Sequence, residues 1–130
     1  MSMSFHRKNG DVAQRFAERR QRENEAQRLE DAVPGLLTLR LDIEERSELL
    51  QLKHVRHFVV GRAPALFVIR CTDPACREGV HDITGAVMRG LREHRTSFEG
   101  EDQGCSGTVG SQQSPCRRVL HFEAVATYAA

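Results

Sequence analysis

Residues 37–44 read Leu37-Thr38-Leu39-Arg40-Leu41-Asp42-Ile43-Glu44, and this stretch decides the fold class of the chain. Large apolar and polar side chains alternate strictly, whereas a helix would repeat its apolar positions every three or four residues. In a strand, such alternation places the apolar side chains on a core and the polar and charged ones in water. The stretch therefore predicts a half-buried strand of an antiparallel sheet.

Two further strands are expected downstream of this one. Residues 45–52 favour either a short helical turn or a wide hairpin loop, and residues 55–60 then form the second strand. After a turn at 61–64, the run Ala65-Leu66-Phe67-Val68-Ile69 is apolar at every position. Because a strand that is apolar on both faces suits the middle of a sheet, we expect this run to be a central strand that leads to Cys71.

The C-terminal half predicts a helix and a closing strand. Asp82 is a suitable N-cap for a helix over 83–94. The apolar face of that helix is expected to carry Ile83, Val87, Leu91 and His94. Residues 118–128 predict the last strand, whose core-facing side carries Leu120, Phe122, Ala124, Ala126 and Tyr128. The expected fold class is α+β: a small, mainly antiparallel sheet of about four strands, with one packed helix, an N-terminal polar helix and a zinc-stapled loop held by four cysteines.

The N-terminal segment, residues 1–33, differs in character from the rest of the chain. A disordered start is followed, over 11–33, by a polar helical arm rich in Arg, Glu, Gln and Ala. No apolar stripe runs through its middle. We therefore expect the arm either to lie in solvent and dock only at its ends, or to bind a protein partner or a second copy of the chain. Pro34-Gly35 ends the arm, and residues 34–130 form the zinc-stabilised α+β domain.

Composition limits what the protein can be. A chain of 130 residues fits one domain with an appended arm. No stretch is apolar enough to span a membrane or to form the core of a signal peptide, so we expect a soluble, cytoplasmic protein that does not bind membranes. The formal net charge is +1, with +1 over 1–33, +2 over 34–70 and −2 over 71–130. Nucleic acid is the less favoured partner, because no segment supplies a strong basic field.

The strongest functional signal is a set of four cysteines, Cys71, Cys76, Cys105 and Cys116. In a reducing cytosol, cysteines are better candidates for metal ligands than for disulfides. Zinc prefers four thiolate or imidazole ligands in a tetrahedron, which two turns from separate parts of a chain can supply. The first pair bounds a turn at the end of a strand, and the second pair lies in or beside the Gly/Ser/Gln-rich segment 100–114. We expect the four to hold one structural Zn²⁺ ion per chain.

Other interpretations of these cysteines stay open. They could be four ordinary buried cysteines, two disulfides in an oxidising compartment, or a redox switch that releases zinc on oxidation. His81 is an alternative ligand, because it lies five residues after Cys76 and could replace one cysteine in a site of three cysteines and one histidine. It could also be a packed or hydrogen-bonded histidine, and its neighbour Asp82 resembles the outer carboxylate partner of a metal-bound histidine.

Known catalytic motifs do not occur in the sequence. His81 is followed by Asp82-Ile83 and not by the x-Glu of zinc deaminases, and no second cysteine follows Cys116 closely. Metalloprotease, serine-hydrolase and phosphate-loop motifs do not occur either. Arginines that could contact phosphate are Arg89, Arg92, Arg95, Arg117 and Arg118, the first three also being expected on the solvent face of a helix. The sequence favours a non-catalytic zinc-binding interaction or regulatory module over a nucleic-acid-binding zinc protein related to transcription or RNA, and over a zinc-dependent or thiol-redox enzyme.

Overall fold

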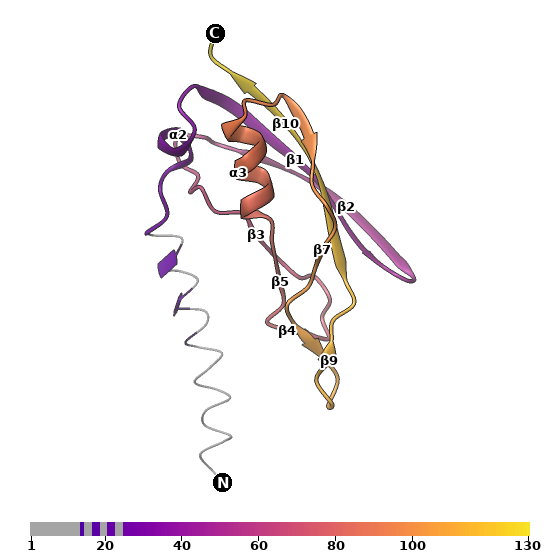
Figure 1. Cartoon of the computed structure of the whole chain (residues 1–130). Coiled ribbons are helices and arrows are strands. Elements are labelled where there is room, and N and C mark those ends of the chain that lie inside the picture. The colour runs from indigo at the N-terminus through magenta and orange to yellow at the C-terminus, as the bar shows by residue number, and fades with distance from the viewer. Residues whose placement is uncertain (1–13, 15–16, 19–20, 23–24) are drawn as a thin grey trace.

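The centre of the protein is one five-stranded antiparallel sheet. The computed structural model describes residues 14, 17–18, 21–22 and 25–130. Its two longest strands, β1 (Leu36–Ser47) and β10 (Val119–Tyr128), pair side by side, and β2 (Leu50–Phe58) flanks β1 at the edge. The short strands β6 (Ser97–Glu99) and β7 (Gln103–Gly104) pair with the other side of β10. Figure 1 shows β2, β1 and β10 as one long layer.

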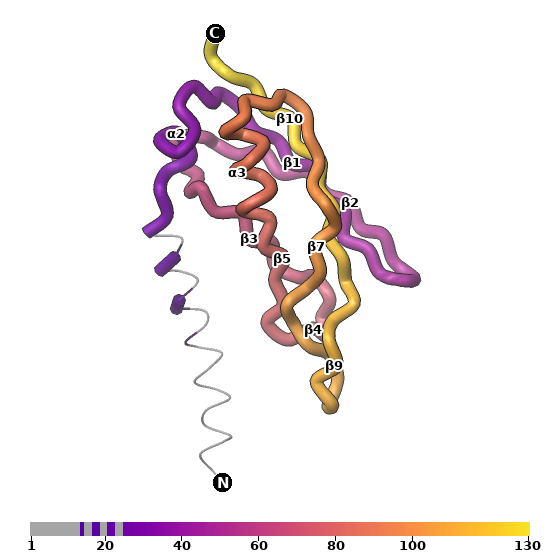
Figure 2. The backbone as a smooth tube through the Cα atoms, in the orientation of Figure 1, coloured from indigo at the N-terminus to yellow at the C-terminus, as the bar shows by residue number. Residues whose placement is uncertain are grey.

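Two smaller sheets lie toward one end of the main sheet, as the backbone tube shows (Figure 2). One pairs β3 (Val68–Arg70) with β5 (Val80–Asp82), and the other has the order β4 (Cys76–Arg77), β8 (Thr108–Val109), β9 (Ser114–Pro115). All of these pairings are antiparallel. The fold is therefore mixed α and β with mainly antiparallel sheets, as predicted. It has more strands than the expected four, because strands of two or three residues carry no periodic pattern.

Strand β1 follows the predicted alternation with one shift at its start. Its core-facing apolar residues after the shift are Leu39, Leu41 and Ile43. The register with β10 shifts between Leu36 and Thr38, where the extra residue reverses the faces. Leu36 is consequently buried and Leu37 is 58% exposed. The expectation that Leu37 faces the core is wrong for this reason.

The hairpin after residue 44 is tighter than predicted. Residues 45–52 form neither a helical turn nor a wide loop, because β1 runs to Ser47, β2 begins at Leu50 and a two-residue turn joins them. The continued alternation puts a carboxylate, that of Glu45, on the core face, where the residue is only 2% exposed. Because Glu45 is acidic, the alternation of apolar and polar residues stops at residue 44 in the sequence. The alternation therefore predicts a strand that is shorter than β1.

Helix α3 (Thr84–Arg92) packs across one face of the main sheet, as predicted (Figure 1). Its buried residues are Val87, Met88, Gly90 and Leu91. Asp82 accepts a hydrogen bond from the Thr84 N–H at 3.1 Å, although Ile83 occupies the N-cap position itself. Because the helix ends at Arg92, His94 leaves the predicted apolar face. It is exposed and stacks on Tyr128, with 4.6 Å between the ring centroids.

The apolar run 65–69 is not the central strand that the sequence predicts. Strand β3 begins only at Val68 and pairs with β5, whereas β1 and β10 occupy the middle of the main sheet. The backbone of Phe67 is tied instead to the start of α3: its N–H donates to Thr84 Oγ1 at 2.8 Å, and its carbonyl accepts from the Ile83 N–H at 2.9 Å. The run is apolar because Phe67 and Ile69 are buried in the core beside this helix start.

Two glycines of α3 should respond in opposite ways to alanine. A Cβ at Gly90 would lie 2.3 Å from the Phe98 ring, whereas a Cβ at Gly85 would meet nothing within 4 Å. Gly85→Ala is expected to raise the free energy of unfolding by about 0.5–1 kcal/mol through helix propensity. Gly90→Ala is expected to lower it by about 1–2 kcal/mol, because overpacking outweighs that gain. Urea unfolding measures both, and equal effects would contradict the close packing of α3 on β6.

The helix α2 (Leu29–Ala32) ties the N-terminal segment to the body. Leu29 and the following Val33 are buried in the core. The backbone leaves the helical conformation at 26–28, where Arg28 forms a β-bridge with Pro64, so the helix predicted over 11–33 is interrupted. Those residues between 14 and 25 that the structure describes are helical and exposed, and the rest of the predicted arm and its start lie outside the described residues. In the described part of the chain, no helix combines the length and apolar character needed to cross a bilayer.

Candidate metal centre

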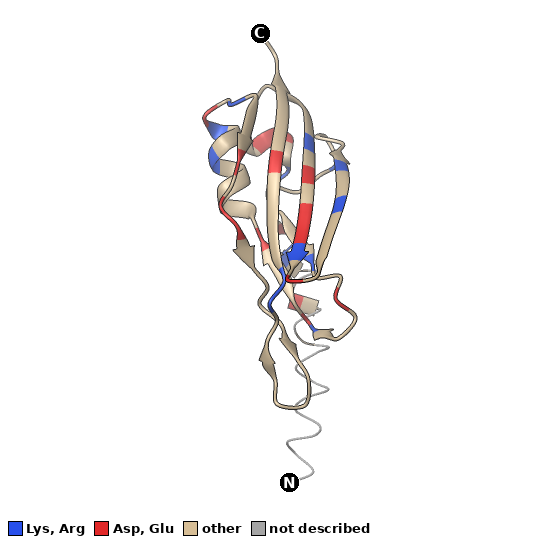
Figure 3. Ribbon diagram, turned by 90° about the vertical axis from the view of Figure 1, so that its right-hand side faces the viewer, with Lys and Arg blue, Asp and Glu red and all other residues tan. Residues whose placement is uncertain are grey.

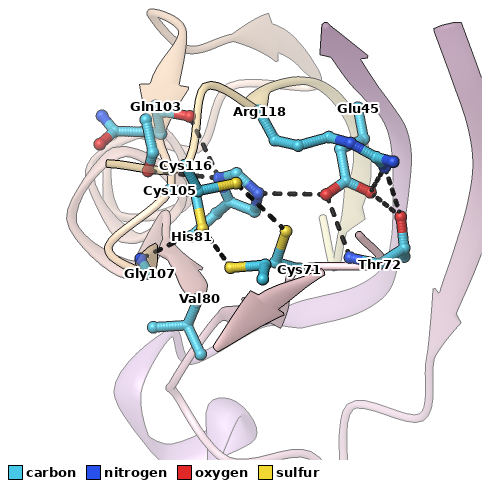
Figure 4. Close-up of polar contacts among 12 residues, drawn as sticks. Glu45, Cys71, Thr72, Val80, His81, Gln103, Cys105, Gly107, Cys116 and Arg118 are labelled. Carbon is cyan, nitrogen blue, oxygen red and sulfur yellow. Dashed lines mark hydrogen bonds and ion pairs between the residues drawn. The ribbon is translucent and has the colours of Figure 1, made fainter. Parts of the chain in front are cut away.

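The four cysteines meet among the short strands of the smaller sheets and β7, and Figure 4 shows the sulfur atoms of Cys71, Cys105 and Cys116 in one cluster. Cys71 follows β3, Cys76 begins β4, Cys105 follows β7 and Cys116 follows β9. Their sulfur atoms all lie within 4.8 Å of one another. The Sγ–Sγ distance is 3.6 Å between Cys76 and Cys105 and 4.0 Å between Cys71 and Cys116. The predicted gathering of these four residues is confirmed, and the cluster could hold a metal ion.

Two of the sulfur–sulfur distances match the edge of a tetrahedral metal site. All four cysteines are free thiols. A zinc ion bound by four thiolates at about 2.3 Å has sulfur–sulfur edges of about 3.8 Å. The two distances of 3.6 and 4.0 Å lie on either side of that edge. Both the donor set and its size are therefore suited to one zinc ion.

Two similar backbone turns support the sulfurs. The amide of Gly107 donates to Cys105 Sγ at 3.3 Å, and the amide of Asp73 donates to Cys71 Sγ. In both turns the donor lies two residues after the cysteine, and an amide N–H stabilises the negative charge of a thiolate. The Cys116 N–H also bonds the Gly107 carbonyl at 2.9 Å. The Gly/Ser/Gln-rich segment is thus folded around the cluster.

Two buried glycines let the backbone approach the sulfur atoms. A Cβ at Gly79 would lie 2.2 Å from Cys105 Sγ and 2.4 Å from Cys76 Sγ. A Cβ at Gly107 would lie 2.3 Å from Cys76 Sγ. Any larger residue at either position would displace a sulfur atom, so the arrangement of the cluster depends on both glycines.

Gly79→Ala is expected to weaken zinc binding by roughly tenfold to a hundredfold, because two sulfurs must move to admit the methyl group. Competition with a chromophoric zinc chelator measures the affinity. Gly104→Ala is the matched control, since this glycine precedes Cys105 directly and a Cβ there meets nothing within 4 Å. Equal affinities of the two variants would mean that the sulfurs do not lie against Gly79 when zinc is bound.

Burial makes two thiols of the metal-free cluster, those of Cys71 and Cys105, weak acids. It raises the pKa of Cys105 to about 11, against a smaller opposing effect of the Gly107 hydrogen bond. Burial likewise raises the pKa of Cys71, and the neighbouring thiols of Cys105 and Cys116 raise it further. Because zinc binds thiolates, metal binding must displace these protons. A bound cation would then compensate the negative charge that four close thiolates create.

A buried polar network lies directly beside the cysteine cluster (Figure 4). Its centre is Glu45, whose carboxylate accepts hydrogen bonds from the Thr72 hydroxyl and from the Thr72 N–H, the latter at 3.2 Å. Arg118 lies 3.4 Å from the same carboxylate and donates to Thr72 Oγ1 at 2.8 Å. Burial raises the pKa of Glu45, but hydrogen bonds from Thr72, Cys71 and His81 outweigh it and hold that pKa below its usual value. The network links β1 to the residue that follows the first cysteine.

His81 belongs to this network and is fully buried. Its Nδ1 lies 3.2 Å from the carbonyl oxygens of both Gln103 and Gly104, so this nitrogen carries a hydrogen. Its Nε2 lies 3.4 Å from Glu45 Oε1. Donor atoms of His81, Glu45 and Cys71 also lie within 4.8 Å of one another, which makes His81 the nearest replacement for a sulfur ligand. A site of three cysteines and this histidine would require the ring to give up at least one of its oxygen contacts.

Sequence reasoning did not find several residues that shape the site. Glu45 had a usable signal, because continuing the alternation of residues 37–44 places it on the core face, where a carboxylate needs donors or cations. Arg118, one of the arginines that could contact phosphate by sequence, is 9% exposed and lies 3.4 Å from Glu45. Gly79 and Gly107 carry no local pattern, since only the folded backbone brings them against sulfur atoms.

Comparison with known proteins assigns the chain to no family. No protein-family model, curated protein or solved structure matches the chain. The donor set is nevertheless informative, because four sulfur ligands in a tetrahedron are typical of zinc and of iron–sulfur proteins. An iron–sulfur cluster holds several iron and sulfide atoms between its thiolates and needs wider spacing than the 4.8 Å found here. The spacing favours a single ion.

Proposed function

We propose that this protein is a non-catalytic interaction or regulatory module whose structural zinc ion is held by Cys71, Cys76, Cys105 and Cys116. The observation that carries the proposal is the complete set of four thiol donors within 4.8 Å. Four thiolates fill the coordination sphere of zinc and leave no position for a substrate or an activated water molecule. The metal then acts by holding one end of the molecule together.

The distribution of the hydrophobic core supports a structural role for the metal. The core cluster includes Ile69, Ile83, Phe98 and Leu120, but it has no member within the fully described segments 70–82 and 99–119. These two segments carry all four cysteines. A region without its own apolar core needs another source of stability, and a structural zinc ion supplies it in many small domains.

Nucleic-acid binding is the less favoured alternative. Arg118 is buried against Glu45 and is not a free phosphate ligand, whereas Arg117 is exposed and lies 3.5 Å from the carboxylate of Glu48. The exposed arginines of the α3 region are Arg89, Arg92 and Arg95. Figure 3 shows acidic residues interspersed with basic ones over the ribbon, which is a poor surface for a phosphate backbone.

Cobalt substitution tests both the ligand set and the closed character of the site. Co²⁺ bound by four thiolates in a tetrahedron gives intense thiolate charge-transfer and ligand-field absorption, and a set of three thiolates and one imidazole gives a shifted spectrum. We expect the tetrathiolate spectrum for the wild-type protein. Azide should leave that spectrum unchanged, because no coordination position is open.

A His81→Gln variant serves as the control, because glutamine keeps hydrogen-bonding capacity at this buried position. Its cobalt spectrum is expected to match that of the wild type. If the cobalt spectrum of His81→Gln differs from that of the wild type, His81 is a ligand. A spectrum that responds to azide would reveal an open metal position and would argue against a purely structural metal.

A further inference from the structure

The outer edge of β2 has no strand paired with it in the part of the chain that the structure describes. Among the described residues, β2 pairs with β1 alone and ends the order of the main sheet. All nine of its residues are exposed or half-exposed. Figures 1 and 2 show the β1–β2 hairpin reaching away from α3, so the layer that covers the rest of the sheet does not cover its tip. The backbone N–H and C=O groups along this edge can therefore pair with one more strand.

The register tells which backbone groups point outward. Ser47 and Leu50 flank the two-residue turn and form the first pair of the hairpin. In such a hairpin the flanking pair is hydrogen-bonded, and hydrogen-bonded and non-hydrogen-bonded pairs then alternate. The residues of β2 whose N–H and C=O groups point away from β1 are therefore Gln51, Lys53, Val55 and His57. They form a row of donors and acceptors that fits an added strand.

The side chains of β2 indicate which kind of segment could add as the new strand. Lys53 and Arg56 are its only charged residues, His54 and His57 accompany them, and the strand contains no Asp or Glu. Apolar surface is interspersed, with Leu52 39% exposed and Val55 54% exposed. An extended segment with acidic side chains would pair with the basic ones, because opposite charges on neighbouring strands attract.

Two other occupants fit this edge less well. A second copy pairing β2 with β2 would set one basic strand against another, and like charges across strands repel. A nucleic acid would meet the acidic residues of the adjoining sheet face, Asp42, Glu44 and Glu123, of which Glu44 already lies 3.8 Å from Lys53. An added acidic peptide strand would lie on the far side of β2, about 10 Å from β1, so that β2 with Lys53 and Arg56 would separate it from the carboxylates on β1 and β10.

We propose that the β2 edge binds an extended acidic segment of a partner protein, which adds as a further strand to the main sheet. This proposal deepens the interaction role and rests on it. It does not require the partner to touch the cysteine cluster, so the docking edge and the metal centre can be tested separately.

The test is selection of a displayed library of random peptides, about twelve residues long, on the full zinc-loaded protein. We expect enrichment of acidic sequences that lack proline. The most enriched peptide is then synthesised, and its affinity is measured by fluorescence polarisation. Binding should weaken as salt is raised. The N–H groups of Gln51, Lys53, Val55 and His57 should become protected from hydrogen exchange when the peptide binds.

Two variants separate strand addition from other modes of binding. Val55→Pro removes an N–H that points to the open edge and spares the bonds to β1, so it should reduce affinity at least roughly tenfold, whereas the control Val55→Thr should not. The double variant Lys53→Glu and Arg56→Glu keeps the backbone intact and should reduce affinity for the acidic peptide by roughly tenfold as well. Zinc content is measured for every variant.

Several results would overturn the proposal. These are the absence of acidic enrichment, unchanged binding by Val55→Pro, dimerisation that Val55→Pro abolishes, or tight binding of a DNA oligonucleotide at this edge. A protein that holds zinc but selects no acidic peptide overturns only the docking edge. A protein that selects acidic peptides but holds no zinc overturns only the metal proposal.

Discussion

Cys76→Ser and Cys116→Ser are each expected to abolish stoichiometric zinc binding and to lower Tm by more than about 10 °C. Each replacement changes one sulfur to oxygen and so removes one of four ligands. Without the metal, no metal–thiolate bonds hold the two cysteine-bearing segments together. The expected zinc content is one ion per chain for the wild type and none for the variants, measured by elemental analysis of purified protein.

The damage should be confined to one end of the molecule. The two cysteine-bearing segments, 70–82 and 99–119, have no member in the main hydrophobic core cluster, whereas β1 and β10 contribute many of its residues. Hydrogen exchange should therefore show that residues 71–80 and 103–116 lose protection when zinc is removed, while the middle of the main sheet keeps it. Chelation of the wild-type protein should reproduce the same pattern.

The matched control for these variants is Ser111→Ala. This residue is exposed in the turn of the β8–β9 hairpin, so its replacement should leave zinc content and Tm unchanged. A metal-free wild-type protein as stable as the purified one would sink the structural-zinc proposal. It would leave four ordinary buried cysteines as the interpretation of the cluster.

Elements with a long periodic pattern were predictable from the sequence. The strands at 36–47 and 119–128 and the helix at 84–92 each bury a regularly spaced apolar face. The prediction of a central strand at 65–69 is wrong because this apolar run has no periodicity. Such a run is compatible both with a strand inside a sheet and with a segment packed beside a helix. Strands of two residues were unpredictable, because their pairing depends on where the cysteine turns place the chain.

The candidate site was predictable in its ligands but not in its surroundings. Four cysteines in a chain without catalytic motifs indicate a common site, and the structure brings their sulfurs together. The residues that make the site fit are set by tertiary contacts. Gly79 is needed because two sulfurs touch its backbone, and Arg118 is needed because Glu45 is buried beside it.

Glu45→Ala is the second change with a large expected effect, a loss of about 3–5 kcal/mol in the free energy of unfolding. Glu45 is 2% exposed, and its partners Arg118 and His81 are 9% and 0% exposed. Removing the carboxylate leaves a buried guanidinium without a counter-charge and removes the acceptor from Thr72. Glu44→Ala is the matched control, because Glu44 lies on the outer face of the same strand, where its ion pairs with Arg46 and Lys53 should contribute only about 0–1 kcal/mol.

A double variant shows whether the loss of stability comes from the unpaired charge of Arg118. Arg118→Met replaces the guanidinium with an apolar chain of similar length, so Glu45→Ala combined with it should be destabilised by less than the sum of the two single variants. Because all four sulfurs remain, each of these proteins should still bind one zinc ion per chain, which separates this effect from that of the cysteine variants. Denaturant unfolding of the zinc-loaded proteins measures the cycle. If Glu45→Ala lowers the free energy of unfolding by no more than Glu44→Ala, the buried carboxylate does not hold β1 against the metal centre. The cysteine turns must then be supported by the metal alone.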